Sequence, residues 1–153
     1  MKVLWVLIVL AVAVLLLTGC SGSGPLIPKI ERPLTADETT HILALADMID
    51  EAGERWAPHS KAVRDLLAKG RIGVGRLRDR KDDAWATYSP RQTSIILDPR
   101  FWRPELYDID RAGVLVIEAC HVLRAAVSDC DAKIREWEQD YFLMTVLKRE
   151  VQE

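Results

Sequence analysis

The chain lacks three features that would place it in a common functional class. It has no excess of basic residues, because 21 Lys and Arg stand against 23 Asp and Glu, whereas nucleic-acid-binding domains normally carry such an excess. Its 153 residues leave no room for a repeat array or for several ordinary domains. The glycines at positions 70, 73 and 75 are not followed by the Lys-Ser or Lys-Thr pair of a phosphate-binding loop. We therefore expect one small domain that binds no nucleic acid.

The longest apolar run is short for a membrane span. It covers Val3–Leu17, which is 15 residues, whereas a membrane-spanning helix usually needs about 20. Lys2 precedes the run and the segment 18–20 (Thr-Gly-Cys) follows it, which is the basic, apolar and small-residue order of a secretory signal. We therefore predict a signal peptide over residues 1–19. Without it, 134 residues remain, and their 20 basic and 23 acidic side chains give a net charge of −3.

The segment 17–20 (Leu-Thr-Gly-Cys) resembles the lipobox of bacterial lipoproteins. The resemblance implies that the signal is cut before Cys20 and that Cys20 carries several acyl chains, which together hold a protein firmly on a lipid bilayer. It also implies export, and Ser21 in place of Asp favours the periplasmic side of the outer membrane if the host is Gram-negative. The alternative is an uncleaved membrane anchor with an incidental cysteine. The expected partner of the N-terminus is thus the bilayer itself.

A tether and a folded domain are expected to follow the signal. Residues 20–33 are rich in Gly, Ser and Pro, which oppose regular structure, and residues 34–153 form the predicted domain. A capping box at Thr35 and Glu38 starts a helix that ends near Gly53. Apolar spacing then predicts a helix over 59–69, strands over 72–77, 84–88 and 93–97, and helices over 111–127 and 132–151. The predicted class is α+β, with two N-terminal helices, about three strands, a central helix and a C-terminal helix.

The helix predicted over 111–127 is apolar on nearly every face, so we expect it to be the buried central helix. The exceptions are Glu118 and His121, which lie three residues apart and therefore on one side of the helix. A buried carboxylate or imidazole is costly unless it is paired, hydrogen-bonded or bound to a metal. One interpretation is that Glu118 and His121 simply form a compensated buried pair.

A second interpretation comes from a resemblance. The segment 117–121 (Ile-Glu-Ala-Cys-His) is similar to the HExxH helix of the zincin metallopeptidases, in which two His bind zinc and the Glu acts as general base on the zinc-bound water. The resemblance gives Glu118 the general-base position and His121 a ligand position. Ile117 stands where the other His belongs, and its side chain has no lone pair. Because catalytic zinc normally has three protein ligands, the resemblance implies a minimal zincin-type domain that has lost its metal.

The resemblance extends to both sides of this helix. The segment 136–142 (Glu-Trp-Glu-Gln-Asp-Tyr-Phe) is similar to the ExxAD segment of the gluzincin branch. It gives Glu136 the role of the third zinc ligand, and Asp131 is the alternative. The strand predicted over 93–97 corresponds to the edge strand that precedes the active-site helix in such folds and can pair with an extended peptide.

We therefore expect a membrane-anchored cell-envelope lipoprotein with a catalytically inactive metallopeptidase-like domain. Such a pseudoenzyme would act as a binding or scaffold module for a peptide or an envelope protein, and no cofactor is expected. One alternative is an active zinc metallopeptidase with a non-standard ligand set. Another is a structural lipoprotein in which Glu118 and His121 complete the core.

Two further expectations concern the C-terminal third of the chain. With Cys20 acylated, Cys120 and Cys130 are the remaining cysteines, and export would place them where a disulfide can persist. The alternative is a buried thiol at Cys120 and a loop thiol at Cys130. The apolar side chains of the last helix are expected to be core, and they are Tyr141, Phe142, Met144, Val146 and Leu147. Trp137 is expected either to line a residual cleft or to cover the central helix.

Overall fold

The computed structural model describes residues 27–77, 84–123 and 127–152. The predicted signal peptide over 1–19 and Cys20 lie outside these residues, as does the first part of the predicted tether. The described chain is a mixed α+β fold with four α-helices and a four-stranded sheet, which confirms the predicted class. In the described ranges, no helix combines the length and the apolar character that crossing a membrane requires.

The elements follow one another in the predicted order, with one added strand at the start. They are β1 (Arg32–Pro33), α2 (Ala36–Glu51), α3 (Ala57–Ala68), β2 (Ile72–Val74), β3 (Ala86–Ser89), β4 (Ser94–Leu97), α4 (Asp108–Val122) and α5 (Val127–Gln152). Short 3₁₀ segments at Glu54–Trp56 and Pro99–Trp102 precede α3 and α4. The periodic patterns therefore located each predicted helix and strand, with ends that shifted by a few residues.

The capping box predicted at the start of α2 is confirmed. The Thr35 hydroxyl accepts a hydrogen bond from the backbone N–H of Glu38, and the Glu38 carboxylate accepts one from the backbone N–H of Thr35. Arg32 in β1 donates two further hydrogen bonds to the same carboxylate, each 2.7 Å long. Glu38 thereby ties the first strand to the first helix.

The sheet has the order β1-β2-β4-β3. Strand β1 is antiparallel to β2, β2 is parallel to β4, and β3 is antiparallel to β4. The predicted tether over 20–33 is therefore too long, because its last residues form β1 and the folded domain begins before Leu34. Pro33 is tolerated there because an edge strand does not need every backbone N–H. Gly75 makes room for this segment, since a Cβ at position 75 would collide with the carbonyl oxygen of Lys29.

Strand β4 was predicted as the edge strand, and this is wrong. It lies between β2 and β3, and β3 forms the edge. All four residues of β4 are buried, which is typical of an interior strand covered on both faces. Any extended peptide that added to this side of the sheet would meet β3.

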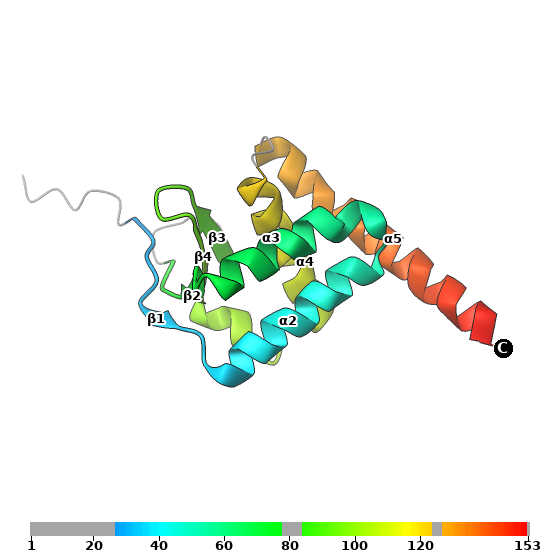
Figure 1. Cartoon of the computed structure of the whole chain (residues 1–153), viewed down its shortest axis with the longest axis horizontal. Helices are drawn as coiled ribbons and strands as arrows, with labels where there is room; N and C mark the ends of the chain where they lie inside the picture. Colours follow the sequence, from blue (N-terminus) through cyan, green and yellow to red (C-terminus); the bar gives the residue numbers. More distant parts are fainter. Residues whose placement is uncertain (1–26, 78–83, 124–126, 153) are drawn as a thin grey trace, which may run out of the picture.

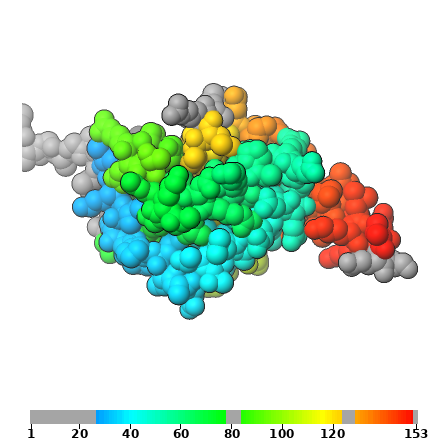
Figure 2. Space-filling model, in the orientation of Figure 1, coloured from blue at the N-terminus to red at the C-terminus, as the bar shows by residue number. Residues whose placement is uncertain are grey.

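Helix α4 is the centre of the fold, as predicted. It packs against α2, α3, α5 and β3, and eight of its residues are buried. Gly113 lets α5 approach closely, because a Cβ there would lie 2.8 Å from the Cδ1 atom of Ile134. Figure 1 shows α2 and α3 running side by side, the small sheet at one end of the molecule, and α5 extending past the other elements. In the space-filling view, the C-terminal part of α5 projects from the body (Figure 2).

Candidate functional site

Glu118 is buried, with 8% of its surface exposed, and it is held by the edge strand of the sheet. The backbone N–H of Tyr88 in β3 donates a hydrogen bond to its Oε2 atom at 2.5 Å. This contact gives a buried carboxylate a partner and gives an edge-strand N–H an acceptor, so each group offsets the desolvation cost of the other. It also occupies the N–H with which an added peptide strand would pair at Tyr88.

His121 and Ile117 are both half-buried and share one face of α4, since they lie four residues apart. The helix places His121 one turn beyond Ile117, as the sequence spacing requires. Among the described residues, no three His, Cys, Asp or Glu side chains form a group that could hold a metal ion. His121, Glu136 and Asp131 therefore do not form such a group of three, and the pairing of His121 with one of the two carboxylates stays a prediction.

Glu136 instead forms ion pairs with two basic side chains. Lys133 donates a hydrogen bond to its Oε2 atom at 2.8 Å, and Arg55 donates another to the same atom. The Lys133 ammonium lowers the pKa of the Glu136 carboxyl below its usual range, and the Arg55 guanidinium adds to this. Asp140, one turn further along α5, pairs with Arg55 at 3.3 Å. This part of α5 thus fastens the segment Glu54–Trp56 to the body.

A half-buried histidine lies beside this cluster. His59 packs against the ring of Trp56, with the ring centroids 5.1 Å apart. Burial lowers the pKa of His59, and the positive charges of Lys133 and Arg55 lower it further. The Trp56 indole N–H donates to Asp140 at 2.8 Å. The cluster therefore joins the start of α3 to α5, and the neutral form of its histidine is favoured. The spacing of these residues along the sequence did not predict this arrangement.

Cys120 and Cys130 form a disulfide, with their Cα atoms 5.5 Å apart. Both residues are buried, with at most 2% exposed. The bond joins the end of α4 to the start of α5 across a sequence separation of 10 residues. A loop of this size contributes about 2–3 kcal/mol by restricting the unfolded chain. The start of α5 is therefore fixed covalently to the central helix.

Trp137 covers the central helix and lines no cleft. Its side chain is fully buried, stacks on Tyr141 with ring centroids 5.4 Å apart, and lies next to Gly113 of α4. The face of α5 that carries Trp137 and Tyr141 is thus the face that belongs to the core.

The opposite face of α5 is apolar and exposed, so the prediction that its side chains are core is wrong for most of them. We call this surface the α5 apolar face, and it consists of Phe142 (69% exposed), Leu143 (58%), Val146 (41%) and Leu147 (45%). Val151 is also exposed (86%), but it lies on another side of the last turns. A 26-residue helix is about 39 Å long, which is far longer than the elements it packs against. Its last turns therefore extend beyond the body.

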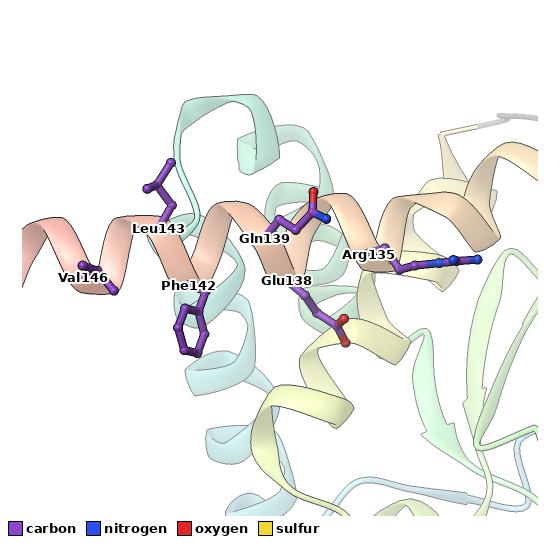
Figure 3. Close-up of a pocket in the computed structure, with 6 residues that line it drawn as sticks. All are labelled: Arg135, Glu138, Gln139, Phe142, Leu143 and Val146. Atoms are coloured by element: carbon purple, nitrogen blue, oxygen red, sulfur yellow. The ribbon is translucent and has the colours of Figure 1, made fainter.

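An open hollow of about 660 Å³ follows this face. It is lined by Arg135, Glu138, Gln139, Phe142, Leu143 and Val146, all of which belong to α5. Figure 3 shows that Glu138 and Phe142 project to one side of the helix, whereas Gln139 and Leu143 project to the other. The arrangement is an apolar stripe with polar margins, which suits the packing of a second helix.

The exposed stripe can be recognised in the sequence from the spacing of its apolar residues, although their number alone does not indicate it. Residues 142, 143, 146 and 147 repeat at intervals of three and four, and they lie on a different side of the helix from Trp137 and Tyr141. Apolar side chains on two sides of one helix require two partners. The rest of the domain covers the side with Trp137 and Tyr141, so the side with residues 142, 143, 146 and 147 still needs a partner.

Comparison with protein-family models, with curated proteins and with solved structures found no match to this chain. The lipobox and zincin resemblances therefore stay predictions from the sequence.

Proposed function

We propose that this chain is a membrane-anchored interaction module of the cell envelope that binds a protein partner through the α5 apolar face. The observation that carries the proposal is the exposure of these four apolar side chains on the projecting half of one helix. Exposed apolar patches rimmed by polar residues mark binding surfaces in soluble domains. Covering such a face removes apolar surface from water at roughly 25 cal/mol per Å².

The position of the helix favours a protein over the anchoring bilayer as the partner. The described chain starts at residue 27 at one end of the molecule, and the tip of α5 lies at the other end (Figure 1). An anchor at Cys20 would hold the first end near the lipid. The α5 apolar face would then lie beyond the anchored end, where other envelope proteins can reach it.

The proposal assigns no catalysis to Glu118. Its contact with Tyr88 supports a structural role, and Ile117 offers no metal ligand. Binding as the function also agrees with Glu136, whose ion pair with Arg55 holds α5 to the body and so helps to set the direction in which the helix projects.

Thiol accessibility tests the proposal. In full-length Leu143→Cys, we expect the new thiol to react at least about tenfold more slowly with a maleimide in isolated cell envelopes than in the diluted, detergent-purified chain, because a bound partner covers it. Lys61→Cys is the matched control, since Lys61 is 73% exposed on α3 and its thiol should react equally in both preparations. Equal reactivity of Leu143→Cys in both would refute the proposed binding surface.

The anchor is tested in the same preparations. Cys20→Ser removes the predicted acylation site, so we expect the chain to leave the membrane fraction. Retention of Cys20→Ser in that fraction after a salt wash would show that something other than acyl chains at Cys20 holds it there.

A further inference from the structure

The margins of the α5 apolar face carry charges that are complementary to a second copy of the same helix. Glu138 lies four residues before Phe142, and Arg149 lies three residues after Val146. Each is about one helical turn from the centre of the stripe, at opposite ends of it. Helical spacing also puts both on the same margin, since eleven residues are close to three whole turns.

An antiparallel pair of α5 helices uses this arrangement. If Phe142 of one copy lies opposite Val146 of the other, Glu138 falls next to Arg149 of the second copy, and the two-fold axis repeats the contact. A parallel two-fold pair would instead put the two copies of this margin on opposite sides of the contact, so Glu138 of one copy would not meet Arg149 of the other. The antiparallel pair is thus the one that brings these opposite charges together, so the charges favour that orientation.

We propose that the α5 apolar face binds a second copy of this chain, with the two α5 helices antiparallel and Glu138 of each next to Arg149 of the other. This inference rests on the proposed function and names its partner. A contact made by a few turns of one helix is small, whereas a specific interface usually covers at least about 1,000 Å² in total. A contact of this size is weak between free molecules, and tethering both copies to one membrane strengthens it by raising their effective concentration.

Cross-linking of the full chain in native membranes tests the orientation. Position 143 lies close to the predicted two-fold axis, so Leu143→Cys should give a covalent dimer with a short bismaleimide. Val151→Cys should not, because antiparallel packing puts the two copies of position 151 about 20 Å apart along the helices. A dimer through Val151→Cys instead of Leu143→Cys would overturn the antiparallel arrangement.

Charge reversal in the Leu143→Cys background tests the named contact. We expect Glu138→Arg alone and Arg149→Glu alone each to lower the dimer yield about tenfold, and the double reversal to restore it to within about twofold of the parent. A structural defect in one variant would not be repaired by the other. Failure of the double variant to recover would overturn the contact.

The remaining outcomes separate this inference from the proposed function. If Leu143→Cys is protected in envelopes but forms no covalent dimer there, the partner is a different protein, and only the second-copy inference fails. If the purified chain on protein-free phospholipid vesicles shows protection without a dimer, the bilayer covers the face, and both proposals fail. Both also fail if position 143 is as reactive in envelopes as in the diluted chain.

Discussion

Glu118 is a charged side chain in a position where charges are rare. It lies on the central helix with 8% of its surface exposed, and the backbone N–H of Tyr88 reaches it at 2.5 Å. A carboxylate that caps the edge strand in this way serves two purposes, since it satisfies a buried donor and docks α4 against β3. Nothing in this geometry requires a metal.

The stability of Glu118 variants tests this role. Glu118→Ala leaves the Tyr88 N–H without its acceptor, so we expect the free energy of unfolding to fall by about 1–3 kcal/mol, measured by urea denaturation of the full-length chain in detergent. Glu118→Gln keeps an acceptor oxygen and should lose less. Glu138→Ala, on the partly exposed surface of α5, should change stability by no more than about 0.5 kcal/mol.

A Glu118→Ala chain as stable as the parent, or more stable, would contradict the structural role. Catalytic groups are often kept at the expense of stability, so that result would support the general-base position that the zincin resemblance assigns to Glu118.

At the scale of elements, the start of α2 combines a local capping motif with a contact from strand β1. Thr35 and Glu38 form a capping box that the sequence predicts by itself. Arg32 then binds the same carboxylate from β1. Chiefly through the Arg32 hydrogen bonds, the pKa of Glu38 falls from its ordinary 4.5 to about 2.

The lowered pKa predicts a dependence of stability on pH. The folded chain binds the Glu38 proton less tightly than the unfolded chain, so the contribution of Glu38 is fully present above pH 4.5 and is lost as pH falls toward 2. We expect Glu38→Gln to be less stable than the parent at neutral pH, with the difference shrinking over that window. Asp37→Asn removes a charge from the same turn without removing the Arg32 contact, and it should show a weaker trend. A parent-to-Glu38→Gln difference that stays constant from pH 5 to 2 would contradict this account.

The elements were largely predictable because their signals are local. Periodic apolar residues and the capping box gave the helices and strands, but β1 was missed because two residues with a proline carry no strand pattern. The neighbours were not predictable. The gluzincin resemblance gave Glu136 the role of a zinc ligand beside His121, whereas in the folded chain Glu136 binds Arg55, 81 positions earlier in the chain. Likewise, the apolar content of α5 could not show that the body ends before the helix does.

At the scale of the whole molecule, the described chain is a small α+β domain from which the second half of one long helix, α5, projects. The disulfide between Cys120 and Cys130 and the ion pair of Glu136 with Arg55 fix the first half of α5, and the second half projects (Figure 2). A rigidly mounted helix loses little conformational entropy when it binds, which favours association. The projecting half of α5 would thus present the α5 apolar face in a fixed direction relative to the rest of the domain.

The central claim is that the α5 apolar face serves binding and not folding, and the Phe142→Ser/Leu147→Ser variant tests it most directly. In the full-length Leu143→Cys background, we expect this double change to leave the free energy of unfolding within about 0.5 kcal/mol of the parent, because both side chains already face water. The same change should raise the maleimide reactivity of position 143 in cell envelopes to that of the diluted chain. A loss of about 2 kcal/mol or more with unchanged reactivity would show that the face is part of the core, and would contradict the claim.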